Sequence, residues 1–305
     1  MSAASHRTVV RYLIGVDGGG TGTRLLLADS HGQVLARAQA GPSALALGAV
    51  AAWAAIEAAA TQAFAALNPA SEPADALPWS SCVLACGLAG VNHEVWRSAF
   101  VALAPPLLCL TVESDAYTAL LGAHQGAPGV VIALGTGSIG AVLSRDGRCE
   151  TVGGYGFPAS DEASGAWLGL RAIQYAQYAL DGRAPVDTYA DALLHACGAR
   201  TRDALIAWLN TARQADYAGL APIVLAHAEH PFVARLLEQA GVEVARMIAA
   251  LDASASLPVA LTGGLASALA GTIPEPYRAR LVPAAADSAA GALRLAAQSA
   301  GLVMA

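Results

Sequence analysis

The most constraining feature of this chain of 305 residues is an order of strands, turns and helices that occurs twice. In its first half, apolar and β-branched segments alternate with glycine turns, which predicts an antiparallel meander followed by helices and buried strands. The expected elements are strands at 9–16, 24–29 and 33–40, a helix at 49–67, a strand at 82–88, a helix at 93–103, a strand at 107–112 and a helix at 116–123.

The same order begins again near residue 130. The expected elements are strands at 130–134, 138–144 and 148–152, a mainly helical region at 162–251, a strand at 258–262, and a last strand and helix within 278–300. Two βββαβα units of this kind predict an α/β protein whose two homologous lobes enclose a central cleft, where ligands most often bind. We expect lobes at 1–118 and 119–305, the second with a helical insertion and a last helix that can pack back on the first lobe.

The basic residues exclude several kinds of nucleotide site. All 17 are arginine, and the sequence contains no lysine. A Walker A loop, the strand lysine of protein kinases and a Schiff-base enzyme each need lysine. If the protein handles ATP, it must hold the phosphates with backbone amides, hydroxyl groups, a metal ion and arginine.

Charge and composition narrow the partners further. A net charge of −6 without clustered basic residues argues against nucleic acid. The alanine-rich stretches are interrupted by polar residues, so we expect no membrane span, and the first residues lack the apolar core of a signal peptide, which favours a cytoplasmic enzyme. The cysteines lack paired metal spacing and are interpreted as small buried apolar residues; they are Cys82, Cys86, Cys109, Cys149 and Cys197.

A glycine-rich turn at 14–24 carries the first chemical motif. Consecutive glycines permit positive φ and can expose successive N–H groups to phosphate oxygens. Asp17, at the end of the strand, can hold Mg²⁺ through its water ligands. The nucleotide-binding residues expected here are Gly18, Gly19, Gly20, Thr21 and Thr23.

Two further glycine motifs complete a set. A strand, glycine turn and strand at 133–140 match the first motif in the second half, and a glycine pair follows the buried strand at 258–262. Their expected nucleotide-binding residues are Gly135, Thr136, Gly137, Gly263 and Gly264. The ordered set resembles the two phosphate motifs and the adenosine motif of the actin, hexokinase and Hsp70 superfamily. This resemblance implies a two-lobed actin-like ATPase fold, related to ribonuclease H, that binds ATP.

Two more segments resemble one branch of that superfamily. Asp115, in Glu113-Ser-Asp-Ala116, follows a buried strand and resembles the catalytic base of superfamily sugar kinases. Residues 153–167 resemble the sugar-side segment of N-acetylglucosamine and glucosamine kinases, in the family of the BadF/BadG/BcrA/BcrD ATPases. This resemblance implies sugar contacts from Gly154, Tyr155, Gly156 and Asp161.

The chain also departs from the family pattern. Glycine is often found where this chain has Ser160 and Ala163, and an asparagine that contacts the sugar is expected where it has Ser43 and Ala44. Structural roles compete with the functional ones as well. Asp115 could cap the helix that begins beside it, and Asp161 could be a first-turn acid that offsets a helix dipole.

The resemblance implies a Mg²⁺- and ATP-dependent kinase that phosphorylates the 6-hydroxyl of glucosamine or N-acetylglucosamine. Phosphoryl transfer needs alignment and charge stabilisation, which glycine turns and a carboxylate base supply. The main alternative is an ATPase activator of a radical dehydratase or reductase, and a non-enzymatic sugar sensor is a second one. We expect a small sugar and ATP as ligands, and a homodimer is possible.

Overall fold

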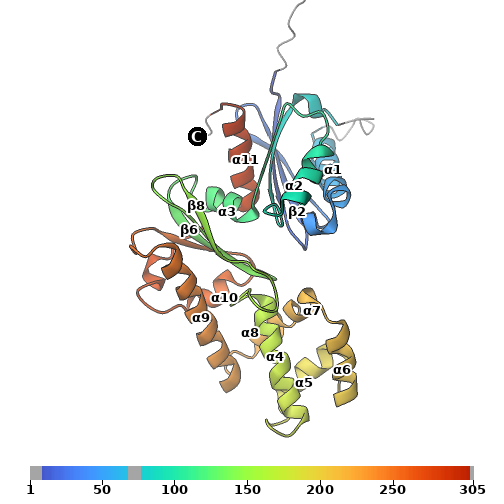
Figure 1. Cartoon of the computed structure of the whole chain (residues 1–305), viewed down its shortest axis with the longest axis vertical. Coiled ribbons are helices and arrows are strands. Elements are labelled where there is room, and N and C mark those ends of the chain that lie inside the picture. Colours follow the sequence, from blue (N-terminus) through green and yellow to red (C-terminus); the bar gives the residue numbers. More distant parts are fainter. Residues whose placement is uncertain (1–8, 68–76, 303–305) are drawn as a thin grey trace, which may run out of the picture. The chain divides into compact units, whose positions relative to one another are not determined.

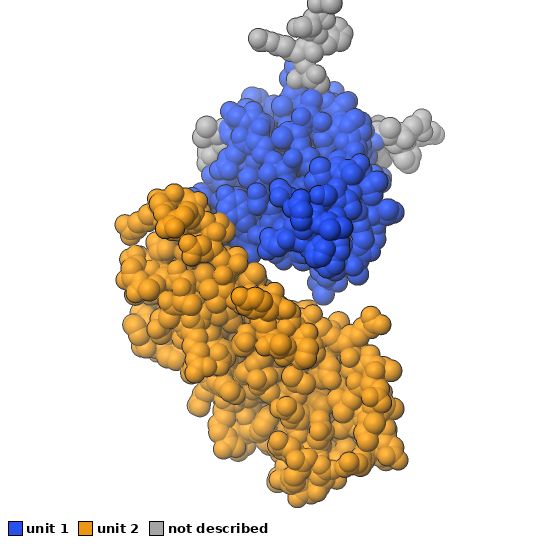
Figure 2. Space-filling view, in the orientation of Figure 1, with its two compact units in different colours: residues 1–127, 284–305 blue, residues 128–283 orange. Residues whose placement is uncertain are grey.

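The computed structural model describes residues 9–67 and 77–302, which form two compact units. Unit 1 comprises residues 1–127 and 284–305, and unit 2 comprises residues 128–283 (Figure 2). The predicted boundary between residues 118 and 119 would cut helix α3 (Asp115–Ala123) in two. The division instead follows α3, because that helix packs on the sheet of unit 1.

The sheet of unit 1 has five strands in the order β3-β2-β1-β4-β5. The first three form an antiparallel meander, and β4 and β5 continue it in parallel with β1. The strands are β1 (Tyr12–Gly18), β2 (Thr23–Asp29), β3 (Val34–Ala40), β4 (Cys82–Leu88) and β5 (Cys109–Glu113). The central strands β1 and β4 are buried on both faces, which explains their continuous apolar sequences.

Helices cover both faces of this sheet (Figure 1). One face is covered by α1 (Ala49–Ala65) and α2 (Glu94–Ala102), which pack through Trp53, Ile56 and Phe100. The other face is covered by α3 and by α11 (Ser288–Ser299), the last helix of the chain. The helix that ends the sequence is therefore part of the layer that supports the first glycine turn.

Three glycines permit α11 to pack directly against backbone atoms. A Cβ atom on Gly15 of β1 would lie 2.3 Å from the backbone nitrogen of Leu293. A Cβ on Gly291 would lie 1.9 Å from the carbonyl oxygen of Thr118, and one on Gly122 would lie 2.1 Å from that of Asp287. No side chain fits at these positions, because interiors are packed without spare volume.

Unit 2 repeats the sheet order of unit 1 with one strand fewer. Its sheet has the order β8-β7-β6-β9, again an antiparallel meander extended by a parallel strand. The strands are β6 (Gly129–Leu134), β7 (Ser138–Leu143), β8 (Cys149–Gly153) and β9 (Val259–Thr262). The predicted last strand near residue 278 is wrong. Arg278–Arg280 forms a 3-10 turn, and Leu281 makes only an isolated bridge to Val259.

The helices of unit 2 form two groups. One group lies beyond the sheet; its members are α4 (Gly165–Leu180), α5 (Thr188–Ala196), α6 (Arg202–Thr211), α7 (Gln214–Ala218) and α8 (Ala221–Ala226) (Figure 1). Within it, α5, α7 and α8 pack against α4. The other consists of α9 (Pro231–Leu251), which packs on the sheet, and α10 (Ala266–Ala270) beside it. In the described ranges, no helix is both long and apolar enough to span a membrane.

We predict that Gly15→Ala strongly destabilises unit 1. Its Cβ atom would meet backbone atoms of α11, which cannot move aside as a flexible side chain can, so we expect a loss of about 3 kcal/mol or more. Gly41→Ala is the control, because a Cβ there meets nothing within 4 Å. Thermal unfolding of both variants tests this prediction, and equal midpoints would contradict it.

Candidate active site

The first glycine turn is fixed by the chain segment that follows β3. The amide of Gly19 donates to the carbonyl oxygen of Gly22 at 3.0 Å. The carbonyl oxygen of Gly19 in turn accepts from the amides of Ser43 and Ala44 at 3.1 and 3.2 Å. These bonds leave the amides of Gly20 and Thr21 without a hydrogen-bond partner in the described part of the chain. The turn therefore offers free N–H donors of the kind that bind phosphate oxygens.

In this turn Gly18 is needed for space, and none of Gly18, Gly19 and Gly20 is needed for positive φ. Gly18, Gly19 and Gly20 all keep φ outside the left-handed region, contrary to the reason expected from the sequence. A Cβ atom on Gly18 would lie 2.2 Å from Ser43 Oγ, whereas one on Gly20 would meet nothing within 4 Å. Gly18 thus serves the packing of the turn, and Gly20 leaves open space at its tip.

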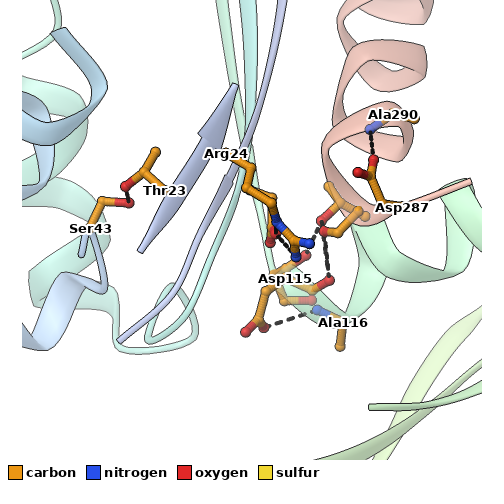
Figure 3. A network of polar contacts seen from close by, with 11 residues as sticks. Thr23, Arg24, Ser43, Asp115, Ala116, Asp287 and Ala290 are labelled. Atoms are coloured by element: carbon orange, nitrogen blue, oxygen red, sulfur yellow. Dashed lines mark hydrogen bonds and ion pairs between the residues drawn. The ribbon is translucent and has the colours of Figure 1, made fainter. Parts of the chain in front are cut away.

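Thr23, predicted to contact the nucleotide, has its hydroxyl inside unit 1. Its Oγ1 lies 2.7 Å from the carbonyl oxygen of Gly41, to which it donates, and 2.7 Å from Ser43 Oγ (Figure 3). Both Thr23 and Ser43 are buried. Their pairing connects the start of β2 to the segment after β3, and Thr21 is the threonine of the motif that is exposed.

The second glycine turn is held in the same way. The amide of Gly135 donates to the carbonyl oxygen of Gly137 at 2.9 Å, and the carbonyl oxygen of Gly135 accepts from the amide of Gly165 at 2.8 Å. Ser138, the first residue of β7, donates its hydroxyl to the carbonyl oxygen of Glu162 at 2.6 Å. Ser138 is the counterpart of Thr23, because each hydroxyl joins the start of the second strand to the segment that follows the third.

Asp161, predicted to contact the sugar, stabilises the second glycine turn through hydrogen bonds to its carboxylate. Its carboxylate accepts from the amide of Ser138 at 3.2 Å and from the side-chain amide of Gln214 at 2.7 Å. A Cβ atom on Gly137 would lie 2.9 Å from Asp161 Oδ2, so glycine makes room for this carboxylate. Burial raises the pKa of Asp161, against the opposing effect of these hydrogen bonds.

The backbone around Asp161 contains two residues other than glycine in a conformation that favours glycine. Asp161 and Ala163 have φ of 67° and 65°, in the left-handed region that favours glycine. A glycine at position 163 would suit this conformation, which is consistent with the family's frequent glycine there. Gly153, Gly154 and Gly156 also have positive φ, so the whole segment follows a path that glycine permits.

The other residues of the sugar-side segment lie at the surface of unit 2. Tyr155 is 91% exposed, and Gly154 is exposed as well. A cavity of about 270 Å³ is lined in part by Tyr155, Ser160, Glu162 and Glu243. The structure therefore brings Tyr155 and Ser160 to one hollow at the surface, while Asp161 turns into the unit.

Asp17 lies opposite Arg24 in the pairing of β1 with β2. Nε and Nη2 of Arg24 donate to the same oxygen, Asp17 Oδ2, at 2.9 and 2.5 Å (Figure 3). No hydrogen bond in the described residues uses Oδ1. A carboxylate with a free oxygen beside unpaired turn amides fits Mg²⁺ held with a nucleotide, because that ion binds through few carboxylates and keeps waters.

Asp115 is the first residue of α3, and the cap of that helix is its neighbour. Ser114 is the N-cap, and its Oγ accepts from the amide of Tyr117 at 3.1 Å. Asp115 Oδ1 accepts from the adjacent amide of Ala116, at 2.9 Å (Figure 3). Burial raises the pKa of Asp115, and the negative charge of Asp17 raises it further. A carboxylate with this environment is suited to accept a proton.

The glycine pair after β9 has two different roles. Gly263 has φ of 89°, and a Cβ there would lie 2.4 Å from the carbonyl oxygen of Leu134, so it serves the contact of β9 with β6. Gly264 is exposed, and a Cβ there would meet nothing within 4 Å. Gly264 is therefore the member of the pair that is free to approach a ligand.

The paired sheets with their matching glycine turns define the chain as an actin-like ATPase, which confirms the predicted fold class. A ROK family glucokinase from Streptomyces griseus has this fold, with a TM-score of 0.56 at 17% identity, over 94% of this chain and 98% of that one. The chain belongs to the BadF/BadG/BcrA/BcrD ATPase family, which matches residues 14–296 and confirms the predicted family.

Two relatives resemble nearly the whole chain. The glucosamine kinase GspK of Vibrio cholerae is 32% identical over 292 residues, which cover 94% of this chain and 96% of the relative. A solved structure from Chromobacterium violaceum, provisionally named an N-acetylglucosamine kinase, is 46% identical with a TM-score of 0.89, over 94% of this chain and 99% of that one. The similarity thus extends over most of both units.

Several supporting residues were missed from the sequence. Arg24 has no predicted role, yet the alternation of β1 and β2 around one turn could have placed it opposite Asp17. Ser138 could have been found by aligning the two glycine motifs. Gln214 gives no local signal, because it reaches Asp161 from a helix 53 residues further along the chain.

We predict that Asp161→Ala destabilises unit 2 by about 1–3 kcal/mol, because it leaves the buried amide of Ser138 without an acceptor. Asp161→Asn is the control, since asparagine tolerates positive φ and its carbonyl oxygen can accept the same bond. The thermal midpoint of each variant is the measurement. Normal stability of Asp161→Ala together with lost sugar binding would instead support a direct sugar contact.

The glycine pair gives a second prediction. Gly264→Ala should keep the thermal midpoint and weaken ATP binding by about tenfold, the equivalent of ~1.4 kcal/mol, because its methyl group enters the space left for the ligand. Gly263→Ala should lower the midpoint, since it adds both strain and a backbone clash. Calorimetric titration with ATP and thermal unfolding distinguish the two, and unchanged ATP affinity in Gly264→Ala would contradict the adenosine assignment.

Proposed function

We propose that this protein is an ATP-dependent kinase that phosphorylates glucosamine or N-acetylglucosamine. The observation that supports this most directly is the arrangement of Asp115, partly buried at the start of α3 in the same unit as the first phosphate turn and Asp17. The similarity to a named glucosamine kinase over almost the full length of both chains supports the same substrate class.

In this proposal Asp115 accepts the proton of the attacking sugar hydroxyl, which the family resemblance implies is the 6-hydroxyl. A raised pKa makes a carboxylate a better base, provided that it is still ionised at the working pH. Its Oδ1 is held by the amide of Ala116. One oxygen therefore fixes the orientation of the carboxylate while the other can receive the proton.

The glycine turns supply the contacts to the nucleotide. In unit 1 the free amides of Gly20 and Thr21 can bind phosphate oxygens, and the turn in unit 2 offers the amides of Thr136 and Gly137 in the same position. Mg²⁺ beside Asp17 would offset the charge that develops on the transferred phosphoryl group. That both turns hold the same ATP molecule stays a prediction from the duplicated sequence motifs.

The alternative, an activator of a radical dehydratase or reductase, is less well supported. Such proteins place cysteines from two subunits around one iron–sulfur cluster. Cys82 and Cys86 are both completely buried in β4, and burial raises the pKa of Cys82 to about 12. Inert buried thiols in the middle of a sheet are poor cluster ligands, because metals bind the thiolate.

The substrate is tested by a panel of hexoses and amino sugars in a coupled assay of ADP release with Mg²⁺ and ATP. We expect glucosamine or N-acetylglucosamine to support turnover of about 1–100 s⁻¹, the usual range for kinases. Comparison of the two sugars at equal concentration decides whether the amino group is acetylated. ADP release that is indifferent to every sugar would overturn the kinase assignment, and iron with a brown colour in the purified protein would favour the activator.

The role of Asp115 is tested by Asp115→Asn. We expect turnover to fall by about 100-fold or more with far less change in sugar affinity, because asparagine keeps the shape of the side chain and cannot take the proton. The thermal midpoint should not fall, since the helix keeps its Ser114 cap and a buried charge is removed. Near-normal turnover would mean that the base is elsewhere, with Glu113 the next candidate.

The raised pKa of Asp115 also predicts how the stability of the folded protein changes with pH. The folded state holds the proton of this group more tightly than the unfolded state, whose carboxyl has a pKa of about 3.9. The contribution of Asp115 to stability therefore declines as the pH rises from about 4 through the folded pKa. Asp115→Asn should remove this part of the pH dependence, which comparison of unfolding midpoints from pH 4 to pH 7 measures.

A further inference from the structure

Arg24 neutralises the carboxylate that the proposed function assigns to the metal. Nε and Nη2 of Arg24 both donate to Asp17 Oδ2, and the two residues are direct cross-strand partners. The exposed fractions of the two side chains differ: 56% for Arg24 and 13% for Asp17. The carboxylate is thus fixed in place, while most of the arginine side chain borders solvent.

Arg24 also has room to move. It lines a cavity of about 330 Å³ together with Arg37, Gln39 and Asp287. Within the described ranges, the hydrogen bonds of the Arg24 side chain go to Asp17, so release of that one carboxylate oxygen frees the guanidinium group. Because the protein contains no lysine, arginine is the only permanently charged cation that a triphosphate could meet in this unit.

We propose that Arg24 is a positioning residue that exchanges its partner when the nucleotide binds. Arg24 is paired with the carboxylate of Asp17, and when Mg²⁺ and the nucleotide bind together it transfers to a phosphate oxygen. This inference rests on the proposed function, because it takes Asp17 as the metal carboxylate. It goes further by assigning a role to Arg24 and by predicting that metal and nucleotide bind cooperatively.

Charge makes this coupling necessary. A divalent cation next to a guanidinium group is repelled, so the metal alone binds weakly while Arg24 stays on Asp17. A nucleotide brings phosphate oxygens, which accept bidentate hydrogen bonds from arginine as well as a carboxylate does. Hydrogen bonds from Arg24 to the phosphate then offset the free energy lost with the Asp17 contact. Mg²⁺ and the guanidinium group can therefore both be held in the site.

The test measures metal binding without any phosphoryl transfer. Mn²⁺, which prefers the same oxygen ligands as Mg²⁺, is titrated into the protein with and without ADP, and free Mn²⁺ is followed by electron paramagnetic resonance. The variants are Arg24→Gln, which removes the charge, and Arg24→Lys, which keeps it. Arg37→Gln is the matched control, because Arg37 is an exposed arginine that lies on the neighbouring strand opposite Leu26 and lines the same cavity.

We expect Arg24→Gln to bind Mn²⁺ about tenfold more tightly than the natural protein when ADP is absent. With ADP present its advantage should disappear, so the factor by which ADP strengthens Mn²⁺ binding should shrink by a similar amount. Arg24→Lys should resemble the natural protein in the absence of ADP, and Arg37→Gln should match it in both conditions. Thermal unfolding of each variant verifies that the compared proteins are folded.

Unchanged or weaker Mn²⁺ binding by folded Arg24→Gln without ADP would overturn the proposal, as would an equal change in Arg37→Gln. A lowered thermal midpoint with unchanged metal affinity would reduce Arg24 to a sheet-stabilising residue and would overturn it too. Failure of the kinase assignment is recognised separately, because it would appear as sugar-independent ADP release in the natural protein.

Discussion

The packing of α11 against bare backbone is the constraint on which the rest of unit 1 depends. At Gly15 of β1 and at the crossing of Gly122 with Gly291, the helix approaches so closely that even a methyl group would overlap main-chain atoms. α11 also holds α3 on the sheet through Thr118, whose hydroxyl lies 2.7 Å from Ser288 Oγ at the start of α11. Asp115, at the first turn of α3, owes its position beside the end of β1 to this arrangement.

The two glycine turns are held by the same pattern of hydrogen bonds, although their sequences differ. In each unit the carbonyl oxygen of the first turn glycine accepts from the segment after the third strand, and a buried hydroxyl at the start of the second strand fixes the same segment. Thr23 and Ser138 therefore keep the turns in shape, while the neighbouring amides are left for a ligand. Supporting residues and residues with unpaired amides alternate within a few positions.

The duplicated order of strands and the glycine turns could be predicted from the sequence, because strand alternation and turn residues are local signals. The last strand near residue 278 was mispredicted, since Leu281 pairs only at one position before the chain leaves for α11. The inward orientation of Asp161 could not be predicted either. It depends on a positive φ and on Gln214, which is distant in sequence. Arg24 and Asp17 both lie in the glycine motif found in the sequence, but their pairing became clear only from the register of β1 with β2.

The return of the last helix to unit 1 has a consequence for the way the chain is made. Unit 2 is one uninterrupted stretch of the chain. Unit 1 is not, because α11, which covers one face of its sheet, follows unit 2 in the sequence. During synthesis, β1 and α3 leave the ribosome long before α11 can cover Gly15 and Gly122, so the apolar face of Leu13, Leu26 and Val83 stays open until α11 has been made. A chain that stops short of α11 would lose this covering layer from the unit that carries Asp115, while the uninterrupted unit 2 would be complete.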